Sequence, residues 1–355
     1  MSLSDIIKEM NKRAKEDVVQ IGITDYKYKR IPFSSPRMNY CTFGGLPVGK
    51  ITEFYGEPHG GKTTTAFDII ANYQKSEDER KVLFIDCENA LDVEWANKIG
   101  VDTDDMVVFK PTNQSAESIL QFILDSIETG EVGLWVLDSI GALVSEQELE
   151  KTVEEKTYAG IAKSLTVFAR KAEMLMQKYN CTGIGINQVR ENINSPYGGI
   201  TTPGGKAWKH FCCCRFEFRQ GSYLDEKGNA ISRSCENPSG NIVMMSMIKN
   251  KSCPPTRRTG SYTLNYYYGI DWLKDLIDVC IKYDIINKRG AWFDIIDTET
   301  GEVLKGNIHG QAEVVQFLVE EENKEILERI KATNTFIKDT FATISKNFKK
   351  SEAYK

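Results

Sequence analysis

The 355-residue chain contains no apolar run as long as a membrane-spanning helix requires, which is about 20 residues. Its first residues, MSLSDIIKEMNKRAKED, contain no apolar block of the kind found in secretory signal peptides. Internal repeats and low-complexity tracts are also absent. With 41% hydrophobic and 27% charged residues, the composition excludes disordered and collagen-like chains. We therefore predict a globular protein of the cytoplasm (the host cytoplasm, if the source is viral) with no membrane partner.

The nine cysteines include no CxxC pair, and Cys212, Cys213 and Cys214 are consecutive. Zinc sites are typically built from spaced cysteine pairs, and disulfide scaffolds do not persist in reducing cytosol. The run is therefore predicted to consist of small apolar core residues.

The chain has no excess of positive charge, because it contains 50 acidic and 45 basic residues and its net charge is −5. This excludes a protein that binds nucleic acid over its whole surface. Two local basic segments remain. Between residues 187 and 215 the charged residues are Arg190, Glu191, Lys206, Lys209 and Arg215. The segment from Lys249 to Arg258 contains no acid.

Short apolar runs alternate with helical patterns between residues 51 and 186. The predicted strands are 51–55, 82–85, 134–137 and 182–186, and the predicted helices are 63–73, 118–127 and 159–179. Such alternation predicts an α/β fold with a mainly parallel, twisted sheet covered on both faces. Beyond Arg215 the pattern becomes β-like, at 242–248 and 262–268, before a helix starts near Asp271.

Four parts are predicted along the chain. Residues 1–35 form an N-terminal arm with a helix at 4–18, residues 36–268 a core, residues 269–345 a small α+β domain, and residues 346–355 a polar tail. The stretch 22–47, rich in proline and glycine, is predicted to be irregular and to contain a domain boundary. An isolated helix as short as 4–18 is marginal in water, so it must pack on the core or on another subunit.

The strongest local signal is the sequence GEPHGGKT at residues 56–63, which fits the phosphate-loop pattern between a strand and a helix. Its glycines let backbone N–H groups converge on one centre, and the helix N-terminus adds partial positive charge. Lys62 is expected to reach the β and γ phosphates, and Thr63 to hold Mg²⁺. The predicted nucleotide-binding residues here are Gly56, Glu57, Pro58, His59, Gly60, Gly61, Lys62, Thr63 and Thr64.

Carboxylates follow two of the predicted strands. Asp138 comes directly after the apolar run 134–137 and is predicted to hold Mg²⁺ together with Thr63. Asp86 and Glu88 end the strand 82–85 on one side, near the sheet edge where ligands bind. One of them could activate the attacking water, although a helix-cap or loop role is the alternative.

A third strand end carries Asn187, Gln188 and Arg190. The amides could sense the γ-phosphate and pass the signal into the loop 191–205, whose flexible backbone suits a phosphodiester chain. A solvated loop without a partner is the alternative. Lys249 and Lys251 either decorate the surface or complete a nucleotide site on a neighbouring subunit.

Taken together, these segments resemble the bacterial RecA family of recombinases from Gly44 to Phe293. The most specific blocks are FIDCENALD at 84–92, LDSIGAL at 137–143, INQVR at 186–190 and IKNK at 248–251. A P-loop ATPase from another family is not expected to carry all four. The resemblance implies a RecA-type P-loop ATPase core with an N-terminal helix-strand arm.

The resemblance implies catalytic roles residue by residue. Glu88 matches the family's water-activating glutamate, and Gln188 matches the glutamine that links the γ-phosphate to the second DNA loop. Lys249 and Lys251 match the lysine pair that reaches the neighbour's ATP. Adenine contacts are implied for Asp92, Trp95 and Tyr266.

DNA contacts are implied as well. The first DNA loop corresponds to about 150–158 and the second to 191–205. The implied DNA-binding residues are Lys163, Arg170, Arg190, Tyr197, Gly204, Gly205 and Lys206. ATP and Mg²⁺ are the implied cofactors. The implied partners are single- and double-stranded DNA, further copies of the chain in a helical filament joined by the N-terminal helix, and single-strand-binding and loader proteins.

We therefore predict an ATP-dependent recombinase that forms filaments on single-stranded DNA and catalyses strand exchange in DNA repair and the SOS response. The alternatives are a RecA-fold motor, a small-molecule kinase, and a scaffold filament without strand exchange. The sequence shows no zinc motif, second ATPase repeat or Arg-rich lid, which disfavours the first two. His210 stands where the family usually has Phe, and the chain ends in a basic rather than an acidic tail. That tail predicts weaker autoinhibition of duplex binding.

Overall fold

The computed structural model describes residues 2–14, 29–151, 160–191, 200–232, 234–297 and 300–332. None of the helices in these ranges is long and apolar enough to cross a membrane.

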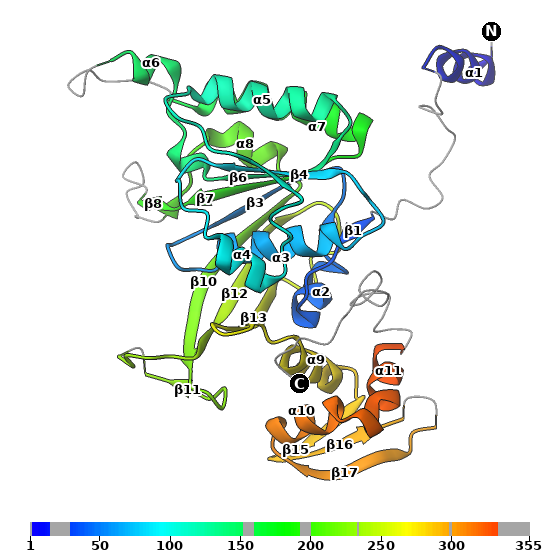
Figure 1. Ribbon diagram of the computed structural model, residues 1–355. Helices are drawn as coiled ribbons and strands as arrows, with labels where there is room; N and C mark the ends of the chain where they lie inside the picture. Colours follow the sequence, from blue (N-terminus) through cyan, green and yellow to red (C-terminus); the bar gives the residue numbers. More distant parts are fainter. Residues whose placement is uncertain are drawn as a thin grey trace.

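A large twisted sheet forms the centre of the molecule (Figure 1). Within the described residues it contains ten strands, in the order β14-β13-β12-β10-β3-β7-β6-β4-β5, with β11 paired to β10. The parallel part comprises β3 (Ile51–Gly56), β4 (Lys81–Asp86), β5 (Met106–Phe109), β6 (Val132–Asp138), β7 (Thr182–Gln188) and β10 (Cys214–Leu224). The antiparallel part comprises β11 (Ala230–Ile231), β12 (Gly240–Asn250), β13 (Thr259–Asn265) and β14 (Gly269–Ile270). The predicted mainly parallel α/β fold is confirmed.

Helices cover both faces of this sheet, as predicted (Figure 1). One core contains side chains of α2 (Pro36–Thr42), α3 (Lys62–Gln74) and α4 (Val93–Ile99). The core on the other face contains side chains of α5 (Ala116–Glu128), α7 (Ala162–Tyr179) and α8 (Gly205–Phe211). Cys212 lies in the second core, and Cys213 and Cys214 lie in the first, so all three are buried as predicted.

The prediction of an irregular segment at 22–47 is wrong at residues 36–42, which form α2. Pro36 breaks a helix interior, but it stands in the first turn of α2, where proline is favoured. Ser35 caps this helix by accepting a hydrogen bond from the Met38 N–H at 3.3 Å. The other elements before the C-terminal part are α1 (Leu3–Ala14), β1 (Arg30–Ile31), β2 (Leu46–Pro47), η1 (Ile140–Ala142), α6 (Glu146–Leu149), β8 (Arg190–Glu191) and β9 (Ile200–Thr201).

The C-terminal part has its own hydrophobic core and a three-stranded antiparallel sheet. Its elements are α9 (Trp272–Lys282), β15 (Ile286–Arg289), β16 (Trp292–Ile296), β17 (Val303–His309), α10 (Gln311–Val319), η2 (Glu321–Asn323) and α11 (Lys324–Ala332). This matches the predicted small α+β C-terminal domain.

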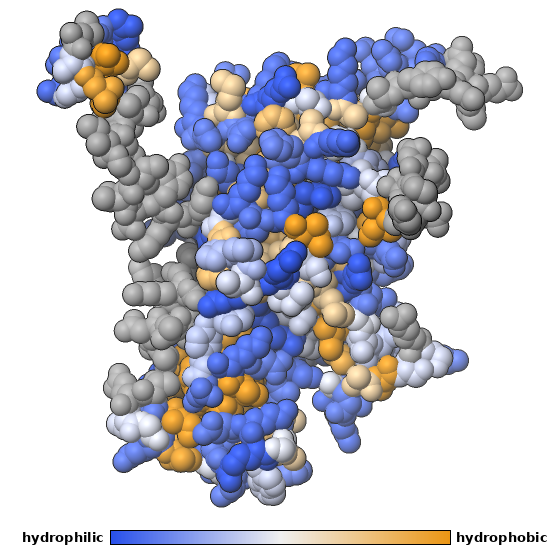
Figure 2. Space-filling view, turned by 180° about the vertical axis from the view of Figure 1, so that it is seen from behind, coloured by the Kyte–Doolittle hydropathy of each residue, from blue (hydrophilic) through white to orange (hydrophobic). Residues whose placement is uncertain are grey.

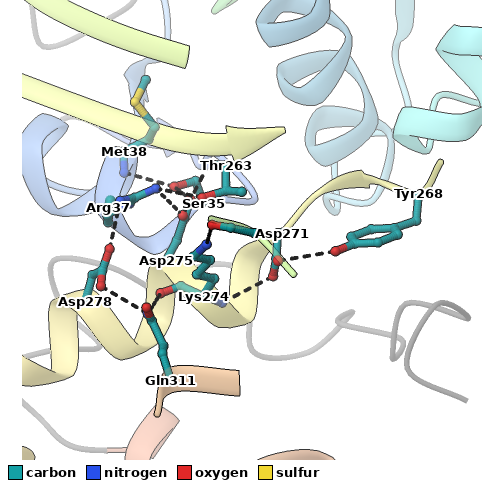
Figure 3. Close-up of polar contacts among 11 residues, drawn as sticks. Ser35, Arg37, Met38, Thr263, Tyr268, Asp271, Lys274, Asp275, Asp278 and Gln311 are labelled. Carbon is teal, nitrogen blue, oxygen red and sulfur yellow. Dashed lines mark hydrogen bonds and ion pairs between the residues drawn. The ribbon is translucent and has the colours of Figure 1, made fainter. Parts of the chain in front are cut away.

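A buried ionic cluster joins this domain to α2 (Figure 3). Arg37 pairs with Asp275 at 2.5 Å and with Asp278 at 2.8 Å. The Ser35 hydroxyl also donates to Asp275, and the Thr263 N–H donates to it at 3.3 Å. We call Ser35, Arg37, Asp275 and Asp278 the junction cluster.

Candidate nucleotide-binding site

The phosphate-loop sequence lies between β3 and α3, where the neighbouring strands β10 and β12 leave room only for glycine at two positions. A Cβ on Gly56 would lie 2.1 Å from the carbonyl oxygen of Phe218 on β10. Gly61 has φ +89°, and a Cβ there would lie 2.8 Å from Val243 on β12. Only glycine fits both places, so the loop backbone can follow the sheet edge and turn into α3.

The Lys62 side chain lies beneath this loop. Its ammonium donates to the carbonyl oxygens of Gly56 at 3.2 Å and Glu57 at 2.8 Å. Burial lowers the pKa of Lys62, and the nearby Asp138 and Glu88 carboxylates oppose that shift. A buried cation is thus held at the loop, where phosphate oxygens are strong acceptors.

Thr63 and Asp138 form a close pair. The Thr63 hydroxyl donates to Asp138 Oδ2 at 2.7 Å. Burial raises the pKa of Asp138 to about 6, although the Thr63 hydrogen bond acts against it. Hydroxyl and carboxylate oxygens are ligands that Mg²⁺ accepts, and Mg²⁺ commonly completes its shell with water and substrate phosphates. No group of three His, Cys, Asp or Glu in the described ranges could hold a metal without such help.

The structure distinguishes the two carboxylates at the end of β4. Asp86 is buried and accepts hydrogen bonds from the N–H groups of Ala90 at 3.0 Å and Leu91 at 3.1 Å, so it holds a loop. Glu88 is exposed, and its Oε1 accepts a hydrogen bond from Gln188 Nε2 at 2.8 Å and another from the Ser139 hydroxyl. The loop alternative therefore describes Asp86, and Glu88 faces the strand ends.

A cavity of about 700 Å³ begins at the phosphate loop. It is lined by His59, Gly61, Lys62, Thr63, Thr64, Trp95, Gln220, Tyr223, Asn241, Val243, Leu264 and Tyr266. The Trp95 indole N–H donates to the Thr64 hydroxyl at 3.1 Å. Asp92 does not line this cavity; it caps α4 and accepts from the Trp95 N–H at 2.9 Å. Gly56, Glu57 and Pro58 border an adjacent cavity.

Five of the lining residues were missed by sequence reasoning: Gln220, Tyr223, Asn241, Val243 and Leu264. They belong to β10, β12 and β13 and follow no motif. Only the strand order brings them opposite α3, so the sequence contained no signal that could have found them.

A sequence model described as the RecA N-terminal domain matches residues 1–271. The chain belongs to the RecA family. Among its relatives, the protein RecA of Ruminococcus albus is 34% identical over 312 residues, which cover 87% of this chain and 73% of the relative. Those of Mycoplasma mycoides and Thermus aquaticus are each 32% identical, with 93% of this chain covered and 91% and 92% of the relatives.

Membership of this family confirms the predicted resemblance and identifies the chain as a RecA-type, ATP-dependent recombinase of DNA recombination and repair. RecA proteins as a family are DNA-dependent ATPases that use ATP and Mg²⁺, bind DNA and form filaments. The role of each residue in this chain stays a prediction.

The two lysines predicted to act across a RecA subunit boundary lie beside α8. Lys249 donates to the carbonyl oxygens of Lys209 at 2.7 Å and His210 at 2.6 Å, and Lys251 donates to that of His210 at 3.4 Å. Neither lysine lines the cavity of its own chain. The carbonyl end of a helix attracts cations, which accounts for this placement.

A polar cluster lies where the segment predicted to be the second DNA loop leaves and rejoins the core. Asn187, fully buried, donates to Glu53 at 2.9 Å and to the Pro203 carbonyl at 3.0 Å. Arg215 forms an ion pair with Glu53. Asn187 and Arg215, which belong to the predicted basic and amide-rich region, therefore have partners within the protein itself. They join the strand before the phosphate loop to the end of the predicted second DNA loop.

The cations predicted to contact DNA are exposed. They are Lys163 and Arg170 on α7, Arg190 on β8 and Lys206 on α8. Arg190 also donates to the Gly141 carbonyl at 3.4 Å. Tyr197, residues 192–199 of the second loop and residues 152–158 of the first lie outside the described residues.

The structure explains why glycine occupies positions 204 and 205, independently of the predicted role of these residues in DNA binding. Their φ angles are +100° and +76°. A Cβ would lie 3.1 Å from Leu165 at Gly204 and 3.1 Å from Ala162 at Gly205. They therefore let α8 start close against α7.

Proposed function

We propose that this RecA protein hydrolyses ATP with Glu88 as the water-activating base. The observation that carries the proposal is the hydrogen bond from Gln188 to Glu88 Oε1, because it joins the candidate base to the strand that leads into the second DNA loop. Oε2 accepts no hydrogen bond from the described residues, so it is open to the proton of a water.

In this proposal the phosphate loop binds the triphosphate. Lys62 would exchange its bonds to loop carbonyls for bonds to phosphate oxygens, which are stronger acceptors. Thr63 and Asp138 would hold Mg²⁺, which neutralises phosphate charge when it is bound.

The same contacts give a route from nucleotide to DNA. Gln188 ends β7, and β8 begins the second DNA loop two residues later. Asn187 binds both Glu53 on β3 and Pro203 at the far end of the loop. A change in what Gln188 contacts is therefore transmitted to both ends of this loop.

The filament contacts are proposed from two exposed features. α1 presents Leu3, Ile6 and Met10 to solvent at 70%, 45% and 48% exposure, and Figure 2 shows apolar atoms on this helix. Such a face fits docking of the N-terminal arm on an adjacent protomer. Lys249 and Lys251 would reach the ATP of the neighbouring subunit. Residues 36–268 would form the ATPase core, and residues 269–345 an accessory domain.

The test is the ATPase rate with and without single-stranded DNA, for the wild type and Glu88→Gln. We expect DNA to stimulate the wild type, and the variant to bind ATP and assemble on DNA while hydrolysing about 10²- to 10⁴-fold more slowly. Glu128→Gln, on the exposed end of α5, is the matched control and keeps the wild-type rate. A Glu88→Gln rate equal to the wild-type rate would contradict the proposal. A joint-molecule assay separates the recombinase from a scaffold filament, which would hydrolyse ATP without exchanging strands.

A further inference from the structure

Lys251 lies just past the end of β12, in the turn 251–258 that leads to β13. Its N–H donates to the Cys213 carbonyl at 3.0 Å, which extends the pairing of β10 and β12 by one residue. Its exposed ammonium makes a long bond to the His210 carbonyl at 3.4 Å, whereas Lys249, inside the strand, makes two bonds at 2.7 and 2.6 Å. The position of Lys251 therefore depends on what holds the turn.

Arg30 binds this turn from a distant part of the chain. Its guanidinium donates to the Ser252 carbonyl at 2.6 Å and to the Ser252 hydroxyl at 3.3 Å. The same guanidinium donates to the Gly45 carbonyl at 3.0 Å, and the Arg30 backbone pairs with Pro47 where β1 meets β2. A planar guanidinium makes several directed bonds at once, so it fixes an orientation as well as a distance. The residue after Lys251 is thereby held to β1 and β2.

A second arginine holds the far end of the turn. Arg257 donates to the Tyr40 carbonyl at 2.9 Å, and its guanidinium lies 4.0 Å from the centre of the Tyr40 ring and 4.3 Å from that of Phe43. A cation over an aromatic ring is attracted by the charge distribution of the ring. Because Tyr40 lies in α2 and Phe43 directly follows it, both ends of the turn are attached to the segment that precedes the phosphate loop.

We propose that Arg30 is a positioning residue that sets Lys251 to reach the ATP of the neighbouring subunit, with Arg257 as its second anchor. This inference rests on the role proposed above for Lys251 across the subunit boundary. A lysine side chain is a flexible four-carbon stem, so a fixed backbone lowers the cost of placing its ammonium on a phosphate. A misplacement of about 1 Å costs up to about 100-fold in rate. Arg30 and Ser252 are 222 residues apart, so no local pattern in the sequence signals this link.

The first measurement is the ATPase rate on single-stranded DNA, with thermal melting as the check on folding. We expect kcat to fall about 10- to 100-fold in Arg30→Met and less in Arg257→Met. The KM for ATP should change little, because the phosphate loop that binds ATP is intact. Arg80→Met is the matched control and should keep the wild-type rate, since Arg80 also donates to backbone carbonyls, but to those of Tyr179 and Asn180.

A mixed-filament assay separates positioning from damage to the variant's own nucleotide site. Arg30→Met keeps the proposed base Glu88 but lacks a placed Lys251, whereas Glu88→Gln has the opposite defect. In an equal mixture, head-to-tail contacts form in four combinations, and about a quarter of them join an intact Glu88 to a placed Lys251. We expect the mixture to regain about a quarter of the wild-type rate. A mixture of Lys251→Met with Glu88→Gln is the reference and should regain the same fraction.

A wild-type rate in Arg30→Met would overturn the inference, as would a mixture no faster than the sum of its two components. If Arg30→Met does not fold, Arg257→Met replaces it in the same mixture and decides. Failure of the Lys251→Met reference mixture is a different result, because it would overturn the proposed action of Lys251 on the neighbouring subunit, and the inference with it.

Discussion

Asp138 and Asp275 are acidic groups withdrawn from water, but their surroundings differ. Asp138 receives a single side-chain hydrogen bond within the described residues, from Thr63. Asp275 is fully buried and is bound by Arg37, Ser35 and the Thr263 N–H. The first carboxylate keeps an oxygen for a ligand, whereas the protein itself occupies both oxygens of the second. We therefore expect Asp138, whose hydrogen-bonding capacity is incompletely used, to act as a ligand, and Asp275, whose oxygens are both bound, to stabilise the fold.

The largest effect is expected from breaking the junction cluster. Arg37→Met would leave Asp275 and Asp278 without their shared cation, and removing one partner of a buried ion pair costs about 3–5 kcal/mol. The free energy of unfolding from urea titration should fall by about that amount. Lys324→Met, which removes an exposed ion pair with Glu321, is the control and should change little. A loss below about 1 kcal/mol in Arg37→Met would contradict the structural role.

Asp138→Asn should show the opposite behaviour. It removes a carboxylate ligand without breaking an ion pair, so we expect Mg²⁺ affinity in the presence of ATP to fall about 10- to 100-fold while thermal stability is kept. Mg²⁺ titration of ATPase activity and thermal melting measure the two effects. Strong destabilisation with normal Mg²⁺ dependence would place Asp138 with the structural carboxylates.

Stability should also depend on pH through Asp275. Burial raises its pKa to about 7 from an ordinary value of 3.8, against the opposing effect of Arg37. The folded protein therefore holds a proton that the unfolded chain releases, so this contribution is full below about pH 4 and is lost as pH rises through about 7. Between pH 5 and pH 8 the free energy of unfolding should fall by about 3 kcal/mol from this group.

Asp275→Asn should remove this part of the pH dependence, as measured by urea titration at both pH values. The part that remains is expected from Asp68 and Asp138, whose pKa values burial raises to about 6. The same slope in Asp275→Asn and the wild type would show that Asp275 is not the titrating group.

The smallest effect is expected at Ser35. Its oxygen caps α2 and its hydroxyl donates to Asp275, so Ser35→Ala should destabilise the protein by about 1–2 kcal/mol. Ser35→Thr, which retains the hydroxyl, should recover most of this loss in thermal melting. Equal losses in both variants would indicate a packing defect rather than a lost cap.

Much of the fold could be predicted because its signals are local. Strands β3, β4, β6 and β7 contain their predicted ranges, since apolar runs between helical patterns indicate buried parallel strands. Helix α2 was missed because proline and glycine on both sides resemble a loop, and its cap residue Ser35 gains its second partner only from α9.

The residues of the nucleotide site also fall into those that the sequence could predict and those that only the structure distinguishes. Glu88 and Asp86 looked equivalent in the sequence because strand alternation puts both on one side. Only the folded chain shows that Asp86 bonds to the loop after β4 while Glu88 meets Gln188 from another strand.

Residues 56–63 and Asp138 were readable from the chain alone, because a phosphate cradle needs consecutive N–H groups and the carboxylate directly follows its own strand. The cavity wall formed by Tyr223, Asn241 and Tyr266, and the partners of Asp275, came from folding. Those groups are distant in sequence, and each acquires its hydrogen-bonding role only when strand pairing and helix packing bring it to its partner and exclude water.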